Sequence, residues 1–275
     1  MDDAGLVFTV LGSGSLGNCT LIERAGATPI LIDCGLSPRA TARRLASLGL
    51  SLDDITDIYV THLDCDHFAR GWVKRLTTHP ISVHVHMRHR TRAVRLGVPG
   101  RHLELFEDTH TRPDGTHVEP VMLAHDGLGS VGYVIEHAGC RFALATDLGR
   151  VPAAVLDRFV ELDGLAFESN YDRTLQLTSD RPPVLKRRIM SGRGHLCNTE
   201  ALDAILRIDT QSRLAHVALL HLSRDCNCPT IIRRLYAERA PHLLPRLTIT
   251  NQTVPSGRHP LVGGRTVGLQ QLALF

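Results

Sequence analysis

The sequence contains no apolar run approaching the roughly 18 residues that a transmembrane helix requires, and its start, MDDAGLVFTV, shows neither a basic segment nor a cleavage site. It also contains no repeated CxxC pair. The seven cysteines are an odd, scattered set, which argues against a disulfide framework. The formal net charge of +3 is too small to establish a nucleic-acid partner by itself. We therefore predict a cytoplasmic protein with no membrane partner.

A chain of 275 residues is long enough to bury one full core. Short β-rich runs alternate with turn residues and helical patterns, and SVGYVIEHAGCRFALATD predicts two strands that turn at Ala138-Gly139. This succession predicts an α/β fold of the αββα type, with two mixed β-sheets packed face to face and helices outside. We expect residues 1–251 to form one catalytic domain. From residue 252 the composition is rich in Gly, Pro and Arg, which predicts a flexible tail over 252–275.

The stretch THLDCDH gathers four potential metal ligands directly after the apolar run DIYV. Alternate residues of an extended segment point the same way, so His62, Asp64 and Asp66 are expected to converge, with His67 close by. Imidazole and carboxylate groups at this density predict a metal site.

The stretch resembles the signature of the metallo-β-lactamase superfamily, HxHxDH followed shortly by Gly, with Gly71 as the matching glycine. Asp64 departs from the pattern, because it stands where the family usually has a histidine. Since carboxylate oxygen is a harder ligand than imidazole, this change favours Mn²⁺ or Fe²⁺ relative to Zn²⁺.

The resemblance implies two divalent metal ions, Mn, Zn or Fe, which suit phosphodiester hydrolysis. Further ligands are found after the apolar runs VMLAHD, FALATD and VALLHL. Asp33, in LIDCG, is expected to support the metal loop, and Asp66 to orient the nucleophile as well as bind metal. The implied ligand sets are His62, Asp64 and His125 for one metal, Asp66, His67 and His221 for the other, and Asp147 as the bridge.

Five further stretches narrow the resemblance to the YycJ-like group of bacterial MBL-fold DNA exonucleases. They are GSGSLGN, ESNYD, LKRRI, GHLCN and HLSRDCN. The resemblance implies a DNA phosphodiesterase, a 5′-to-3′ exonuclease of repair or replication. The second stretch usually reads ESNHD in this group, so Tyr171 is a departure.

These stretches supply the candidate substrate-binding residues. GSGSLGN lacks the GKS or GKT of a phosphate-binding loop and opens a strand, so it predicts a tight turn beside the site. His195 is the candidate proton donor to the leaving oxygen, whereas Asn198 has a helix cap as its alternative role, and the basic run near it is either a DNA-binding edge or a solvated helix face. The set comprises Ser13, Ser15, Asn18, Asn170, Lys186, Arg187, Arg188, His195 and Asn198.

The last five residues, QLALF, resemble the pentapeptide by which bacterial replication and repair proteins bind the DNA polymerase sliding clamp. The matching positions are Gln271, Leu272, Leu274 and Phe275. The alternative is a last strand or a tail folded on the body. If the resemblance holds, it favours DNA as substrate, because attachment to the clamp raises the local concentration of enzyme at DNA.

Two other classes of function remain open at this point. The first is a small-molecule hydrolase acting on a cyclic phosphodiester, lactone or thioester, since the fold alone does not select the substrate. The second is a repair adaptor that binds the clamp and has a weak or inactive metal site. The short interval between Asp147 and His221 leaves no room there for the large insertion of RNA-processing relatives.

Overall fold

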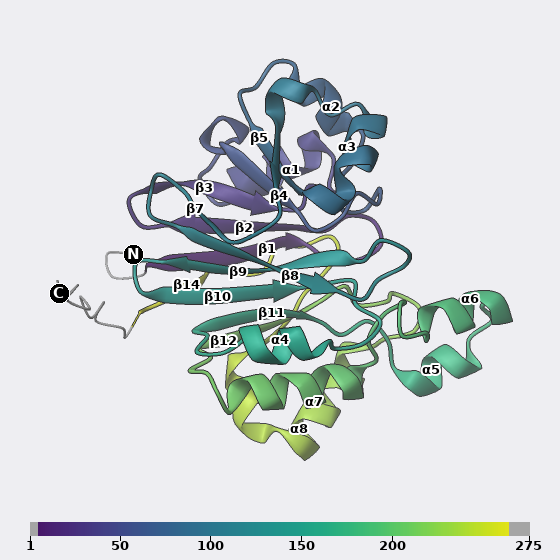
Figure 1. The fold of residues 1–275 in the computed structure, drawn as a ribbon. Coiled ribbons are helices and arrows are strands. Elements are labelled where there is room, and N and C mark those ends of the chain that lie inside the picture. The colour runs from purple at the N-terminus through teal and green to yellow at the C-terminus, as the bar shows by residue number, and fades with distance from the viewer. Residues whose placement is uncertain (1–4, 264–275) are drawn as a thin grey trace, which may run out of the picture.

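The structure is a computed structural model that describes residues 5–263, and two β-sheets lie face to face in its middle (Figure 1). The first sheet contains, in spatial order, β14 (His259–Leu261), β1 (Leu6–Gly12), β2 (Cys19–Arg24), β3 (Ala27–Ile32), β4 (Asp57–Val60), β5 (Ser82–His86) and β6 (Leu103–Phe106). The second contains β13 (Leu247–Ile249), β12 (His216–Leu220), β11 (Gly164–Glu168), β10 (Cys140–Ala145), β9 (Ser130–His137), β8 (His117–Leu123) and β7 (His110–Thr111). Both sheets contain parallel and antiparallel pairs.

Helices cover the outer face of each sheet, which confirms the predicted αββα sandwich (Figure 1). The first sheet is covered by α1 (Pro38–Ala46), α2 (Gly71–Leu76) and α3 (Arg90–Leu96). The second is covered by α4 (Ala153–Arg158), α7 (Asn198–Asp209) and α8 (Pro229–Arg239). The remaining helices are α5 (Arg173–Thr178), α6 (Pro183–Ile189) and the 3₁₀ turns η1 (Leu52–Asp54), η2 (Met87–His89), η3 (Gly100–His102) and η4 (Pro241–Arg246).

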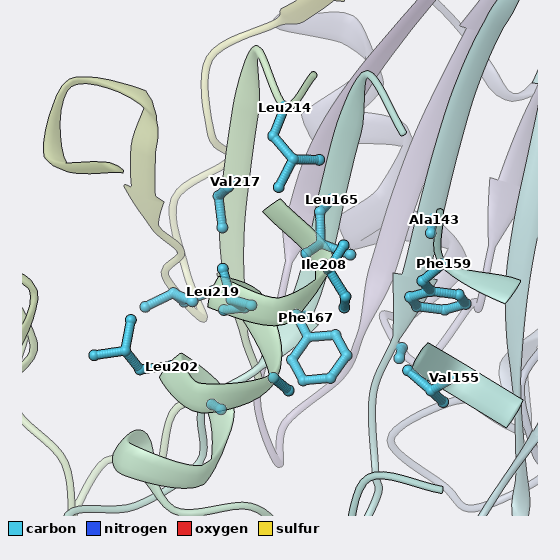
Figure 2. Packing of buried hydrophobic residues seen from close by; sticks show 14 of the residues in the cluster. Ala143, Val155, Phe159, Leu165, Phe167, Leu202, Ile208, Leu214, Val217 and Leu219 are labelled. Atoms are coloured by element: carbon cyan, nitrogen blue, oxygen red, sulfur yellow. The ribbon is translucent and has the colours of Figure 1, made fainter. Parts of the chain in front are cut away.

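The apolar runs of the sequence are continuous because the central strands are buried on both faces. In β11, Leu165 and Phe167 face the helices, and Ala166 between them faces the other sheet. Figure 2 shows Leu165 and Phe167 packed with Ile208 of α7. At roughly 25 cal/mol per Å² of buried apolar surface, these contacts hold the layers together and fix the position of the strand ends.

The turn between β9 and β10 lies at the predicted residues. Ala138 and Gly139 both have positive φ, 49° and 76°, as the tight turn of a two-residue hairpin requires. Three short helices, α2, α5 and α3, were not predicted. Each has six or seven residues, which is too short to show a helical period in the sequence.

The predicted start of the tail at residue 252 is corrected by the structure. β14 pairs with β1, with Leu261 beside Leu6, and the guanidinium of Arg258 donates two hydrogen bonds to Glu23. The body of the protein therefore includes residues 252–263. The four residues of the clamp-like peptide lie outside the described part of the chain. Within residues 5–263, none of the helices has both the length and the apolar composition of a membrane span.

Candidate active site

The carboxyl ends of five strands from the two sheets meet at one end of the sandwich. Four of these strands are largely buried, β8 is buried only at alternate positions, and a polar residue ends or follows each of the five. Parallel strands bring their carboxyl ends to the same edge, where α/β proteins commonly bind ligands. The five polar residues, all buried, are His62 after β4, His125 after β8, Asp147 after β10, Glu168 at the end of β11 and His221 after β12.

Three residues at these strand ends have a left-handed backbone. Asp33, Asp147 and His221 have φ values of 62°, 55° and 53°. Non-glycine residues adopt this conformation at a cost, and such strain is concentrated at functional sites. The surrounding packing therefore maintains a local geometry that an isolated peptide would avoid.

His62, Asp64 and His125 form the first cluster of potential ligands. One ligand atom of each lies within 4.8 Å of the others, so the structure brings together the first predicted metal set. Burial, with His67 nearby, keeps the pKa of His62 well below its usual value and the imidazole neutral, as a metal ligand must be. Asp64 also forms an ion pair with Arg92, in which Nη2 of Arg92 lies 2.5 Å from Oδ1 of Asp64.

Asp147 lies at the centre of the second cluster. Its Oδ2 is 2.5 Å from Nε2 of His67, and its Oδ1 is 2.7 Å from Nδ1 of His221. Oδ2 of Asp66 lies 3.8 Å from Nε2 of His67 and 3.7 Å from Nε2 of His221. Since His62, His67 and Asp147 also converge, Asp147 lies where the two predicted sets meet, as a bridging ligand requires.

The charges of this second cluster fit divalent cations. Burial alone would lower the pKa of His67, but the carboxylates of Asp147 and Asp33 outweigh burial and raise it well above its usual value. Burial would raise the pKa of Asp147, yet His221 and His67 outweigh it and keep the carboxyl ionised. Oδ2 of Asp147 is buried, and its close contact with Nε2 of His67 lacks the geometry of a hydrogen bond. Buried carboxylates packed this closely against imidazole nitrogens are a donor set that a metal ion satisfies.

Asp33 and the glycine-rich loop hold these ligands in place. Asp33 accepts a hydrogen bond from the amide of Thr61 at 2.8 Å, and its Oδ2 lies 2.7 Å from Nδ1 of His67. Ser13 Oγ accepts from the amide of His221 at 2.7 Å and donates to Oδ1 of Asn18, whose Nδ2 is 2.9 Å from Nε2 of His67. Ser13 and Asn18 are buried, so the structure places them as supports of the ligands and not on the cavity surface.

His195 and Glu168 form a pair, and with Asp147 and His221 they make a third group of potential metal ligands. Nδ1 of His195 lies 2.7 Å from Oε1 of Glu168 and 3.2 Å from Oδ1 of Asp147. Burial alone would lower the pKa of His195, but Glu168 and Asp147 outweigh it and raise the pKa to about 10. Because Nδ1 is held by carboxylates, Nε2 remains for a group bound in the cavity.

A cavity of about 570 Å³ opens above the ligands. Four predicted substrate residues line it: Ser15, Asn170, Arg188 and His195. Asn170 also donates from Nδ2 to the carbonyl of His221 at 2.6 Å, which ties the cavity wall to a ligand.

Three other predicted substrate residues do not line this cavity. Lys186 donates from Nζ to the carbonyl of Leu177, and Arg187 is exposed on a different side of α6. Asn198 is buried, where it is hydrogen-bonded to Ser169 and Asn227. It is the first residue of α7, after the N-cap Cys197, so neither of its two predicted roles describes its contacts.

Tyr171, the departure within ESNYD, lies away from the ligands. It packs in a small buried cluster with Cys197 and Cys226, and residues 171 and 197 form a β-bridge. Tyr171 is therefore part of the packing beneath α7, and the metal clusters do not include it.

Several residues of the site were not predicted. Glu168 follows the same rule as Asp147, because an acidic residue closes a buried apolar strand, and that signal was available in GLAFE. Arg181, Asp126 and Asp225 line the cavity from loops, where the sequence offers no periodic signal.

The fold, the strand-end ligands and the paired clusters define a class of protein. The family model of the metallo-beta-lactamase superfamily matches residues 12–195, and the chain belongs to this superfamily. Among solved structures, the metallo-beta-lactamase fold protein YhfI from Bacillus subtilis superposes with a TM-score of 0.69 at 15% identity, covering 94% of this chain and all of that one. This likeness confirms the fold.

Two relatives place the chain more closely. Exodeoxyribonuclease YycJ of Bacillus anthracis is 29% identical over 231 residues, which are 83% of this chain and 87% of the relative. Exodeoxyribonuclease WalJ of Streptococcus pneumoniae is 27% identical over 234 residues, 82% of this chain and 85% of the relative. The predicted resemblance to the YycJ-like group is confirmed, and the protein is an enzyme, a metal-dependent hydrolase.

Proposed function

We propose that the protein is a cytoplasmic DNA phosphodiesterase with two divalent metal ions, acting as a 5′-to-3′ exonuclease in repair or replication. The observation that carries this proposal is a set of three groups of potential metal ligands, two of which contain Asp147, at the base of a cavity with arginines on its wall. Two relatives of nearly full-length coverage are named as exodeoxyribonucleases, which supports DNA as the substrate.

The two predicted ligand sets would hold the metal ions, with Asp147 shared between them. When bound, two such ions would lower the pKa of a water molecule and would neutralise charge that develops on a phosphate. Asp64 supplies an oxygen where imidazole is usual, so we expect activity with Mn²⁺ to exceed activity with Zn²⁺.

The protein's own groups then position and protonate the substrate. Asp66 is only partly exposed at the cavity base, where its carboxylate orients the attacking water. His195, held at Nδ1 by Glu168, directs Nε2 at the cavity and donates a proton to the leaving oxygen. Glu168 acts through His195 and is a positioning residue.

Digestion of end-labelled DNA tests this function. Purified protein loaded with Mn²⁺ is expected to release mononucleotides from the 5′ end of labelled single- or double-stranded DNA, and a chelator is expected to stop the release. The readout is the product ladder from 5′- and 3′-labelled strands. Release from the 3′ end would reverse the proposed polarity. If a folded, metal-loaded protein leaves every DNA intact yet cleaves small cyclic diesters or lactones, the small-molecule hydrolase replaces this proposal.

The clamp-like peptide makes a separate prediction. Deletion of residues 271–275 is expected to weaken binding to the bacterial sliding clamp by at least about a hundredfold, because its two large apolar side chains would fill the clamp's groove. The rate of DNA digestion without the clamp should stay within about twofold of the full chain. Surface plasmon resonance on immobilised clamp measures the first effect. Equal clamp affinity of both forms would refute the recruitment, and loss of digestion would show that the tail folds on the body.

A further inference from the structure

Two arginines on the cavity wall are independent of the ligand clusters. Arg181 precedes α6 and Arg188 lies within it, and both line the cavity. Figure 1 shows α5 and α6 projecting from the end of the sandwich, away from the helices that cover the sheets. We call residues 173–189, which include both helices, the α5–α6 arm.

Each arginine is paired with a carboxylate that also lines the cavity. Nη2 of Arg188 is 2.7 Å from Oδ2 of Asp126, and Nη2 of Arg181 is 2.9 Å from Oδ2 of Asp225. Asp126 follows the ligand His125 directly, so the first pair connects the arm to a ligand loop. The side chains of Arg188 and Asp126 are 62% and 40% exposed, whereas Asp225 is 72% exposed and Arg181 only 22%. Arg181 also donates hydrogen bonds to Gln176 and Ser223. Exposed pairs of this kind contribute little to stability because water screens them.

A phosphate competes well for such arginines. The planar guanidinium forms two parallel hydrogen bonds with phosphate oxygens, and these are among the stronger hydrogen bonds in proteins. The aspartates hold the guanidinium groups at the cavity mouth until a phosphate replaces them. They also repel a polyanion, so each aspartate both positions its arginine and opposes DNA.

The depth of the site restricts the form of DNA that reaches it. His62, Asp147 and His221 are each at most 3% exposed at the base of the cavity. A volume of about 570 Å³ is that of a small-ligand pocket, and a stacked base pair with both of its strands does not enter it. Leu185 and Ile189 of α6 line the same wall and offer apolar contact to an unstacked base.

We infer that the α5–α6 arm binds a single DNA strand, with Arg181 and Arg188 exchanging Asp225 and Asp126 for successive phosphates as the strand end enters the cavity. This inference rests on the proposed phosphodiesterase function. It makes the arm the element that selects a single-stranded end.

The test compares opposite changes at the two pairs. The variants are Arg181→Ala, Arg188→Ala, Asp126→Asn and Asp225→Asn, with Arg233→Ala on α8 as the matched control. The substrates are a labelled single-stranded oligonucleotide, the same strand in a blunt duplex, and bis(p-nitrophenyl) phosphate. Each arginine variant is expected to lose about tenfold in kcat/KM on the single strand, and this loss should exceed any loss on the small diester. The slope of log(kcat/KM) against the logarithm of the salt concentration should become shallower by about one. Each asparagine variant should gain a few fold on the single strand.

Opposite changes in kcat/KM for the Arg→Ala and Asp→Asn variants of one pair distinguish substrate binding from structural support. If the pairs only hold the arm in place, Asp→Asn and Arg→Ala will both lower activity, and the inference is wrong. Equal losses on the oligonucleotide and the small diester, or equal rates on single strand and blunt duplex, also overturn it. Thermal melting identifies an arginine variant that fails to fold. In that case the Asp→Asn variant of the same pair tests the inference, which requires its activity on the single strand to rise. Failure of the metal-loaded wild type on DNA and diester alike would instead refute the proposed function.

Discussion

Replacing Asp147 with alanine is expected to reduce DNA hydrolysis by at least about a thousandfold, because several kcal/mol of transition-state stabilisation depend on the metal pair. Asp147 contacts His67 and His221 and lies where the two ligand sets meet. In the proposed arrangement, its removal would take a shared ligand from both metal ions at once. Metal content measured by inductively coupled plasma mass spectrometry should fall together with the rate.

Asp157→Ala provides the matched control for this change. Asp157 is an exposed residue of α4 and does not line the cavity, so its loss should alter neither rate nor metal content. Circular dichroism before and after metal loading shows whether the Asp147 variant is folded. A folded variant that keeps two metal ions and more than a tenth of the wild-type rate would contradict the bridging role.

Replacing Gly35 with alanine is expected to disrupt the site without removing any ligand side chain. A Cβ at Gly35 would lie 1.7 Å from the carbonyl oxygen of Asp66, which is a backbone atom and has no side-chain freedom with which to yield. The same carbonyl accepts a hydrogen bond from the amide of Asn18 at 2.7 Å. The segment carrying Asp66 must therefore move by more than an ångström.

Such a displacement predicts two measurable losses. The free energy of unfolding should fall by about 3 kcal/mol in urea titrations, as overpacking of a buried contact does. DNA hydrolysis should fall about a hundredfold, because ångström-scale misplacement of catalytic groups has effects of this size. Gly100→Ala is the control, since a Cβ there meets nothing within 4 Å. Wild-type stability and rate in the Gly35 variant would show that the two loops are not closely packed in solution.

The positions of the potential metal ligands were predictable because each stands next to a strand that its own residues identify. His125, Asp147 and His221 each follow a short apolar run, VML, FALA and VALL, and the strands that carry these runs end together. Glu168 also ends a buried apolar strand, GLAFE, so the position of an acidic residue at a strand end was enough to predict it.

The substrate residues were less predictable because they depend on which way a helix faces. The run Lys186-Arg187-Arg188 shows charge but not orientation, and only packing places Arg188 at the cavity and turns Lys186 to the carbonyl of Leu177. The start of the tail was misplaced for a related reason. Composition does not reveal that Leu261 is fully buried, with its side chain beside Gly164.

The position of β14 separates two ends of the enzyme. Leu261 lies beside the start of β1, whereas Ser13, just past the end of β1, contacts His221. The length of β1, roughly 20 Å at 3.4 Å per residue, therefore stands between the metal centre and the place where the described chain ends. A partner that binds the sandwich at the β14 end would therefore leave the entrance of the cavity, at the other end of β1, uncovered.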